Sequence, residues 1–367
     1  MRRPIRALAA ALAVVALAAT TAVASTGDAT AKLTVSPYRL PDATIEQLRG
    51  EFIDQVLDRH EPGTWAPLRF DLGDQHLAKM GLPPAHVLRG MDFSAPTMVD
   101  RHGNAERVEL PALATVAGAG WFGIRPGGLL LLIDDQGIGW CSLAHVFGSP
   151  GSYKISTAGH CGKTGTKATM IAAFGNRAGV TNPILLDFGK FSTSKDAGPG
   201  ADWALIDVEA RYQHLVTPTM AFWGGPRGTF TKTGAVAGLS FPGNSLIPSV
   251  SVNPDPFLAQ QIVHYGHGTA VGTGGTPRSG TALHWGKSHY MFFGAISPGD
   301  SGSGANTLLG DAPGDTMEAA GIMTHLWVDP LMRNGLGVMA GTRTTVIRSA
   351  LANGQLVSYP VPAPILP

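Results

Sequence analysis

The chain has 367 residues, of which 44% are hydrophobic, and its 27 Lys and Arg residues nearly balance 26 Asp and Glu residues. Disorder needs low hydrophobicity and high net charge, so this composition excludes a mostly disordered chain. The balanced charge gives no chain-wide basic field, so no nucleic-acid partner is predicted. The 48 glycines are roughly double the usual share. With little helical periodicity, they favour an all-β, loop-rich body.

Residues 1–24 are predicted to be a secretory signal peptide. A short cationic stretch precedes an apolar run from Ala7 to Ala19, and residues 22–24 have the small-x-small pattern that a signal peptidase cleaves. The apolar run has 13 residues, fewer than the ~20 that span a bilayer. We therefore expect a secreted, extracellular protein with no stable membrane association, whose cysteines meet oxidising conditions.

The region that follows, residues 25–115, is predicted to be partly helical. Residues 42–60 place apolar side chains on one helical face, and shorter helices are expected at Leu77–Met80 and Ala85–Leu88. Two interpretations stay open: a propeptide that assists folding and is then removed, or a permanent accessory region. β-Topologies with many non-local contacts fold slowly, which gives a propeptide a physical purpose.

Beyond Pro111, short β-type runs alternate with Gly, Pro, Asn and Asp, which predicts a barrel or sandwich. A helix over Thr344–Ala352 is expected to close this domain, which spans residues 116–358, before a Pro-rich tail at residues 359–367. The predicted strands are Gly128–Ile133, Lys154–Thr157, Trp203–Val208, Met291–Ile296, Ala319–Thr324 and Gly335–Ala340.

Three short motifs carry candidate chemistry. His160 follows a β-type run beside Cys161, a place for a fixed general base, although an isolated His is more often structural. Asp202 opens an apolar strand, where a buried carboxylate needs a partner such as a His ring, unless it is a turn acid. Ser301 lies in Gly299-Asp300-Ser301-Gly302, where glycines permit a tight turn that directs N–H groups at an oxyanion. The order His, Asp, Ser differs from that of α/β-hydrolases and subtilisins.

In this combination the chain resembles the chymotrypsin-like serine peptidases, especially the secreted bacterial branch of streptogrisin and α-lytic protease. The likeness covers roughly residues 125 to 352. It implies two antiparallel six-stranded β-barrels with a C-terminal helix, His160 and Asp202 on the first barrel and Ser301 on the second. The motifs that carry it are Cys141-Ser142-Leu143, Thr157–Cys161, Asp202–Leu205, Pro298–Gly302, Gly321–Thr324 and Gly337–Ala340.

The resemblance implies a monomeric serine endopeptidase that acts on protein or peptide substrates. Ser301 would be the nucleophile, His160 the base and Asp202 the group that orients the base. Backbone N–H groups of Gly299 and Ser301 would form the oxyanion hole. Cys141 and Cys161 would form a disulfide. This chemistry requires no cofactor, and no metal is predicted because the 12 His residues lack ligand spacing of the HExxH kind.

The resemblance also suggests a substrate-binding set consisting of Ala295, Thr324, Leu326 and Gly337. Ala295 stands where an enzyme specific for basic residues would carry Asp. Leu326 stands at a pocket entrance that is often Gly. We therefore expect a preference for a small or apolar side chain immediately before the scissile bond.

Two departures from the family pattern surround the nucleophile. Ser303-Gly304 replaces the usual Gly-Pro. Asp300 has three candidate partners, which are His267, Arg278 and an amino terminus freed by cleavage. If His267 is the partner, the active loop should weaken as His267 deprotonates.

Two other functions compete with the peptidase. A catalytically silent relative of the same fold would be a binding module; Ser303-Gly304 favours it, whereas the intact set of His160, Asp202 and Ser301 argues against it. A secreted esterase on another fold would need a G-x-S-x-G elbow, which residues 299–303 do not supply.

Overall fold

The structure is a computed structural model. The residues that it describes are 65–68, 70–110, 123–135, 137–177, 179–220, 223–235, 261–268, 276–308, 317–327, 336–352 and 354–358. The predicted signal peptide, the helix over residues 42–60 and the Pro-rich tail lie outside these residues.

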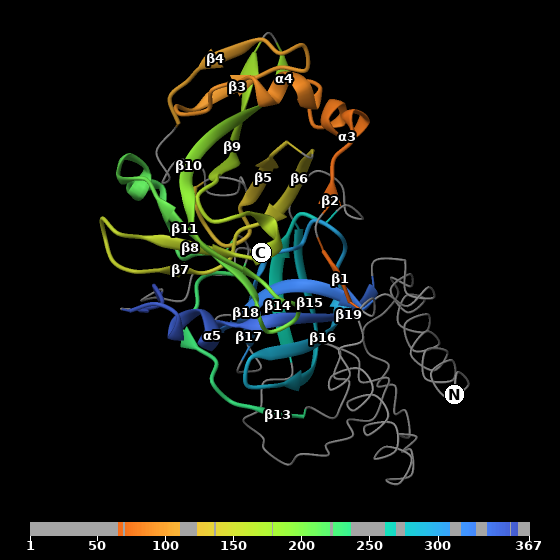
Figure 1. The fold of residues 1–367 in the computed structure, drawn as a ribbon, viewed down its shortest axis with the longest axis vertical. Helices are drawn as coiled ribbons and strands as arrows, with labels where there is room; N and C mark the ends of the chain where they lie inside the picture. The colour runs from red at the N-terminus through yellow and green to blue at the C-terminus, as the bar shows by residue number, and fades with distance from the viewer. Residues whose placement is uncertain are drawn as a thin grey trace, which may run out of the picture.

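Two curled sheets form the body, one above the other in Figure 1. The first sheet has ten strands in the order β2-β6-β5-β9-β10-β11-β8-β7, with β3 paired to β10 and β4 paired to β3. All of its pairs are antiparallel. Its strands are β2 (Phe70–Asp71), β3 (Thr97–Val99), β4 (Ala105–Arg107), β5 (Leu129–Ile133), β6 (Ile138–Ser142), β7 (Val146–Phe147), β8 (Lys154–Thr157), β9 (Lys167–Arg177), β10 (Val180–Asp196) and β11 (Asp202–Val208).

The second sheet has nine strands in the order β1-β18-β17-β14-β15-β16-β19, with β12 paired to β18 and β13 paired to β15. Additional pairing between β18 and β19 curls the sheet back on itself. Its strands are β1 (Trp65–Pro67), β12 (Gly228–Thr229), β13 (Gly234–Ala235), β14 (Gln261–Gly266), β15 (Thr276–Trp285), β16 (His289–Ala295), β17 (Gly304–Leu308), β18 (Met317–Trp327) and β19 (Leu336–Arg343).

The predicted all-β class and the closing helix α5 (Thr344–Ser349) are confirmed. Each sheet has more than the six expected strands because short strands outside the predicted set join its edges. Among them are β2, β3 and β4 in the first sheet and β1 and β12 in the second.

Apolar side chains from both sheets and α5 form a cluster that joins the two halves. Phe147, Trp203 and Leu205 come from the first sheet, Ile322 comes from β18, and Ile347 comes from α5. Burial of such side chains stabilises the contact by roughly 25 cal/mol per Å² of apolar surface. The junction therefore fixes the ends of β11 and β18 relative to each other.

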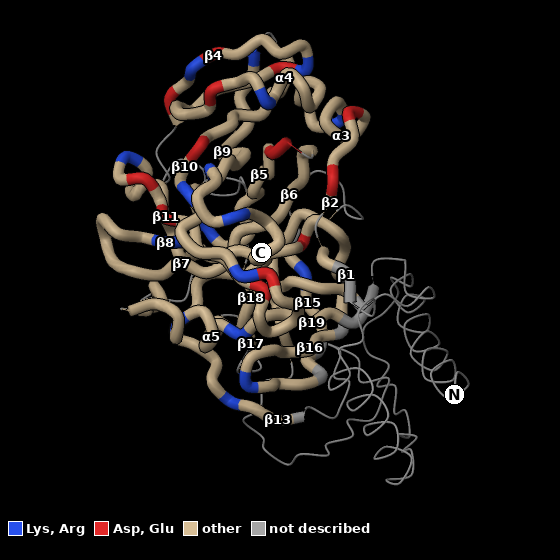
Figure 2. Tube along the Cα trace, viewed as in Figure 1, with Lys and Arg blue, Asp and Glu red and all other residues tan. Residues whose placement is uncertain are grey.

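The segment between residues 72 and 99 packs against the first sheet rather than forming a body of its own. It carries two short helices, α3 (Asp74–Lys79) and α4 (Ala85–Arg89), which match the predicted helical segments. Their buried leucines and Phe93 share one apolar cluster with Leu131, Trp140 and Leu185 of the sheet. Figure 2 shows charges of both signs over α3, α4 and β4, as expected of a near-neutral chain. In the part of the chain that is described, no helix has the length and apolar character to cross a membrane.

Candidate active site

Three side chains from separate segments meet between the two sheets. His160 lies in the short 3-10 helix η4 (Gly159–Cys161), Asp202 begins β11, and Ser301 lies in the turn before β17. Nδ1 of His160 is 2.6 Å from Oδ2 of Asp202, and its Nε2 is 2.6 Å from Oγ of Ser301. Both are hydrogen-bond distances, so Nδ1–H can donate to the carboxylate while Nε2 accepts the hydroxyl proton.

The carboxylate of Asp202 is fully buried and held from both sheets. Its Oδ1 accepts hydrogen bonds from the backbone N–H groups of Gly159 and His160, the latter at 3.2 Å. The backbone of Asp202 is bonded to Thr342 on β19: its N–H donates to Oγ1 at 3.2 Å, and Oγ1 donates to its carbonyl at 2.7 Å. These bonds fix the carboxylate with Oδ2 facing the imidazole.

A second histidine, His325 on β18, lies beside this pair. Its ring centre is 5.8 Å from that of His160, and its Nδ1 is 3.5 Å from Oδ2 of Asp202. Nδ1 also shares a hydrogen bond of 2.9 Å with Oγ1 of Thr324. Burial lowers the pKa of His325 to about 4, so its ring is neutral at pH 7. Asp202 therefore lies next to two imidazole rings, that of His160, the candidate general base, and that of His325, which is neutral.

The nucleophile loop, Ser297–Gly302, is shaped by two glycines with positive φ. Gly299 has φ +104° and Gly302 has φ +81°, values that favour glycine. A Cβ at Gly299 would overlap Nε1 of Trp140, and one at Gly302 would overlap Oγ1 of Thr157. The loop is bonded to β6, because the N–H of Ser142 donates to the carbonyl of Ser301 at 2.6 Å. Any larger residue at either glycine would push the loop away from the first sheet.

Asp300 is fully buried beneath this loop and paired with Arg278 of β15. The guanidinium Nη1 of Arg278 donates to Oδ2, and the side chain of Arg278 is only 4% exposed. The backbone N–H groups of Ser297 and Gly268 also donate to the carboxylate, each at 2.9 Å. Burial raises the pKa of Asp300, and Arg278 and the two N–H groups act in the opposite direction.

Of the three partners considered for Asp300, the structure shows Arg278. His267, another of these candidates, instead donates its Nε2–H to the carbonyl of Gly127, 2.5 Å away. Burial lowers the pKa of His267 to about 4. A weakening of the loop as His267 deprotonates near neutral pH is therefore not expected, because that ring is already neutral there.

Cys141 of β6 and Cys161 of η4 form a disulfide, with their Cα atoms 6.2 Å apart. Both are buried in the apolar cluster of the first sheet. The link ties the turn that carries His160 to the strand that contacts the nucleophile loop. His160 is therefore held next to β6 by a covalent link, and β6 in turn is hydrogen-bonded to Ser301.

The four residues expected to bind substrate lie on three strands of the second sheet. Ala295 ends β16 opposite Leu336, and Gly337 on β19 lies opposite Gly294. Thr324 on β18 is buried, and its Oγ1 donates to the carbonyl of Ala340 at 3.1 Å.

Leu326, also on β18, packs against the apolar cluster of the second sheet. That cluster supplies an apolar lining beside the strand. The binding role of these four residues stays a prediction.

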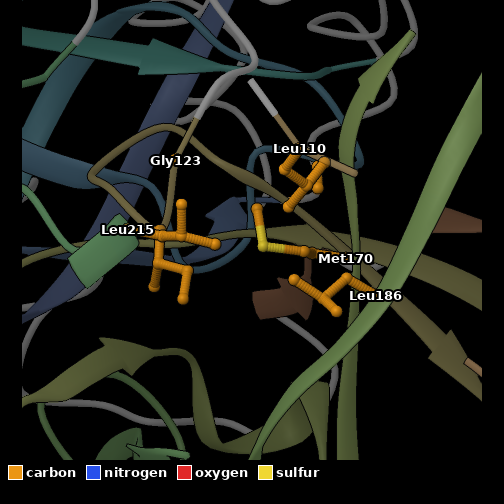
Figure 3. A pocket seen from close by; sticks show the side chains of 7 residues that line it. Leu110, Gly123, Met170, Leu186 and Leu215 are labelled. Carbon is orange, nitrogen blue, oxygen red and sulfur yellow. The ribbon is translucent and has the colours of Figure 1, made fainter. Parts of the chain in front are cut away.

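A separate hollow lies within the first sheet, away from the three side chains. Figure 3 shows Leu110, Met170, Leu186 and Leu215 pointing into it. Met170 and Leu186 face each other on paired strands β9 and β10. The lining is apolar and belongs to the packed core of this sheet, so it supplies no group that could orient a polar ligand.

Among the described residues, His160, Asp196 and Asp202 offer ligand atoms close enough together for a cation. Burial raises the pKa of Asp196, and the charge of Asp202 adds to this effect. However, Oδ1 and Oδ2 of Asp202 are already bonded to backbone N–H groups and to Nδ1 of His160. In this structure the Asp202 carboxylate and Nδ1 of His160 are therefore engaged in hydrogen bonds within the protein.

Thr342 and His325 were missed by the sequence analysis. Both contact Asp202 across the boundary between the sheets, more than a hundred residues away along the chain. No local motif marks them, because the register of β18 and β19 decides which side chains reach Asp202.

The chain matches no protein-family model and no curated protein. Similar solved structures include Thermobifida fusca Protease A, with 17% identity, a TM-score of 0.39, and coverage of 64% of this chain and 99% of that chain. A glutamic acid specific serine protease has 15% identity, a TM-score of 0.34, and coverage of 64% and 100%. An α-lytic protease homolog, N4, has 13% identity, a TM-score of 0.30, and coverage of 62% and 96%.

Proposed function

We propose that the protein is a serine endopeptidase that hydrolyses peptide bonds through an acyl-enzyme on Ser301. The observation that carries this proposal is the position of the His160 ring, 2.6 Å from both Oγ of Ser301 and Oδ2 of Asp202. A Ser hydroxyl becomes a competent nucleophile only when a base can take its proton. The same arrangement argues against a catalytically silent binding module.

In the proposed reaction, Oγ of Ser301 attacks the scissile carbonyl carbon while Nε2 of His160 takes the hydroxyl proton. Asp202 holds the ring in the tautomer with the proton on Nδ1 and stabilises the imidazolium that forms. The N–H groups of Gly299 and Ser301 stabilise the oxyanion, each contributing about 3–4 kcal/mol in comparable sites. His160 then gives its proton to the leaving amine, and water hydrolyses the ester by the same steps.

The proposed specificity is for a small or apolar side chain before the scissile bond. Its support is the apolar cluster beside Leu326, which includes Ile296, Met323 and Met339. A charged side chain placed among these residues would lose its hydration without gaining a partner. Fluorogenic peptides that differ only at this position, with Leu, Lys or Asp, measure this preference through kcat/KM.

We further propose that the protein is exported and acts outside the cell as a monomer, after removal of residues 1–24. The disulfide between Cys141 and Cys161 is compatible with an oxidising compartment. The assignment of residues 25–115 as propeptide or accessory region, and of 116–358 as the peptidase domain, remains part of this proposal.

Hydrolysis of a Leu-containing fluorogenic peptide by secreted protein tests the proposed activity. Ser301→Ala should lower kcat by about 10⁶-fold, as loss of the nucleophile does in comparable enzymes. Ser303→Ala is the matched control, because the Ser303 hydroxyl bonds to the carbonyl of Tyr265 and lies outside the proposed machinery. Equal activity of the parent and Ser301→Ala would refute the proposal.

A further inference from the structure

A segment of the chain itself runs through the candidate site from one sheet to the other. Before the site, β1 (Trp65–Pro67) pairs with β18, with Ala66 opposite Leu326 and Pro67 opposite His325. After it, β2 (Phe70–Asp71) pairs with β6, with Phe70 opposite Trp140. Both neighbours border the site, since β18 carries His325 and β6 carries Ser142. The chain therefore passes from the second sheet, which Leu68 contacts, to the first sheet, which Phe70 joins.

The backbone of Leu68 is held as the residue before a scissile bond would be. Its N–H donates to the carbonyl of Thr324 at 2.9 Å, and its own carbonyl accepts the N–H of Gly299 at 2.5 Å. Gly299 precedes Ser301 by two residues and is one of the proposed oxyanion donors. The N–H that would stabilise a tetrahedral oxyanion is thus already bonded to the Leu68 carbonyl oxygen.

Pro67 fits this register without the loss of a hydrogen bond. Opposed positions in an antiparallel pair alternate between bonded and non-bonded. Because Leu68 donates its N–H to Thr324, the preceding Pro67 falls at a non-bonded position, where its missing N–H is not needed.

The side chain of Leu68 is the apolar anchor of this segment. It is 0% exposed and packs in the cluster of the second sheet that includes Ile296, Met323 and Met339. The side chain of Pro67 next to it is exposed. The burial of Leu68 directly before the candidate bond is what we expect if this cluster forms a specificity pocket for leucine.

The chain beyond this point is held by quite different contacts. Leu72, Leu77 and Leu88 are buried with Trp140 and other residues of the first sheet. The Tyr212 hydroxyl also donates to the carbonyl of Ser94 at 2.7 Å. Scission after Leu68 would therefore leave the downstream segment anchored, whereas the described residues before the bond are held by the pairing of β1 with β18, the N–H of Gly299 and the Leu68 side chain.

From these contacts we propose that the peptide bond between Leu68 and Arg69 is the first substrate of this active site. The proposal rests on the proposed peptidase function and names the chain itself as the substrate. Within residues 25–115, proposed above as propeptide or accessory region, it assigns those before Arg69 to the removable propeptide and the rest to the accessory region. Residues from Phe70 to about 110 remain part of the mature first sheet.

The step balances as an ordinary hydrolysis. Oγ of Ser301 bonds to the carbonyl carbon of Leu68, and His160 receives the hydroxyl proton. The C–N bond to Arg69 then breaks, and His160 protonates the new amine. Water attacks the Leu68 ester and passes its proton to His160, and Ser301 recovers that proton as Leu68 leaves as a carboxylate. One water molecule is consumed.

The same contacts keep other peptides out of the site until the segment leaves. A foreign substrate would need the edge of β18 and the N–H of Gly299, which β1 and Leu68 occupy. Full-length protein should therefore show little activity on added peptides, and activity should rise as the segment before Arg69 is released.

The test is amino-terminal sequencing and intact mass of secreted full-length protein. We expect the parent to yield a chain that begins at Arg69, and Ser301→Ala to remain uncut at this bond. Ser301→Ala removes a single oxygen and needs no repacking. Cleavage after another residue, or cleavage after Leu68 in Ser301→Ala expressed alone, would overturn the proposal.

Two substitutions test the role of the Leu68 side chain. Leu68→Met keeps an apolar side chain of similar size and should still be cut. Leu68→Asp would place a charge in the apolar cluster and should slow scission by more than about a hundredfold. Equal scission of both variants would show that the side chain does not select the bond.

Failure of this proposal can be separated from failure of the proposed function. If the parent stays uncut, trypsin can open the chain after Arg69. Hydrolysis of a Leu-containing peptide by the opened protein would then preserve the peptidase proposal and reject self-cleavage. Opened protein that intact mass shows to have lost the segment before Phe70, and that still has no activity, would reject both.

Discussion

Each sheet buries one carboxylate next to Ser301, and the two carboxylates have different partners. Asp202, on the first sheet, is bonded to the ring of His160, whose other nitrogen faces the Ser301 hydroxyl. Asp300, which contacts the second sheet, is paired with the guanidinium of Arg278 and accepts two backbone hydrogen bonds. The partner of a buried carboxylate therefore decides whether it can assist a proton transfer or stabilises the surrounding structure. Asp202 is placed to assist proton transfer, whereas Asp300 holds the nucleophile loop.

The largest expected effect is on catalysis at Asp202. Asp202→Asn should lower kcat by about 10⁴-fold, because the amide no longer holds the His160 tautomer that accepts the Ser301 proton. Its matched control is Asp207→Asn at the other end of β11, an exposed acid paired with Lys154, which should change kcat less than twofold. Steady-state hydrolysis of a fluorogenic peptide measures both. A variant of Asp202 that retains a tenth of parental kcat would contradict the assigned role.

The next effect is on stability at Asp300. Arg278→Met leaves a fully buried carboxylate without its cation, so the free energy of unfolding should fall by about 3–5 kcal/mol. Urea unfolding of secreted protein gives this value. Arg107→Met breaks an exposed pair with Asp92 and should leave the free energy of unfolding nearly unchanged. If the two substitutions cost the same, the pair beneath the loop is not the support that we describe.

The smallest expected effect concerns pH and the junction between the sheets. His145, in the first sheet's part of the junction, donates Nε2–H to the carbonyl of Gly321 on β18 at 3.0 Å. Burial lowers its pKa to about 4, from about 6.5 in the unfolded chain. Between pH 6.5 and 4 the unfolded chain therefore binds a proton at His145 that the folded protein does not bind. Stability should fall by up to about 3 kcal/mol as pH drops through that window.

Chemical unfolding at several pH values measures this dependence. His145→Gln keeps a donor but cannot titrate, so its stability should decline less steeply than the parent's between pH 6.5 and 4. His267 and His325 also have pKa values lowered to about 4, so the variant should retain part of the slope. If the free energy of unfolding falls equally steeply with pH in the parent and in His145→Gln, His145 does not contribute to the pH dependence.

The sequence predicted the all-β class and six strands whose centres agree with the structure, because each run is short, apolar and bounded by turn residues. Lys154–Thr157 agrees at both ends. The long β9 and β10 were not predicted. Their alternation is interrupted at register shifts near Ile184, Asp187 and Phe191, so no regular period of two marks them.

The residues of the candidate site also fall into those that the sequence predicted and those that it did not. His160, Asp202 and Ser301 each lie in a local motif, and their order along the chain was enough to propose that they meet. Arg278 and the segment around Leu68 have no such motif. Their places depend on the register of β14 with β15 and of β1 with β18, which a single sequence does not determine. The sequence left His267, Arg278 and a new amino terminus open as partners of Asp300, and the strand register places Arg278 there.

The central claim is that the ring of His160 activates the Ser301 hydroxyl. Reaction of the processed protein with a fluorophosphonate, followed by peptide mapping of the adduct, tests it most directly. The account predicts one adduct per chain, located on Ser301, and a rate of labelling that falls by orders of magnitude in His160→Gln. An adduct on another residue, or equal labelling rates in the parent and His160→Gln, would contradict it.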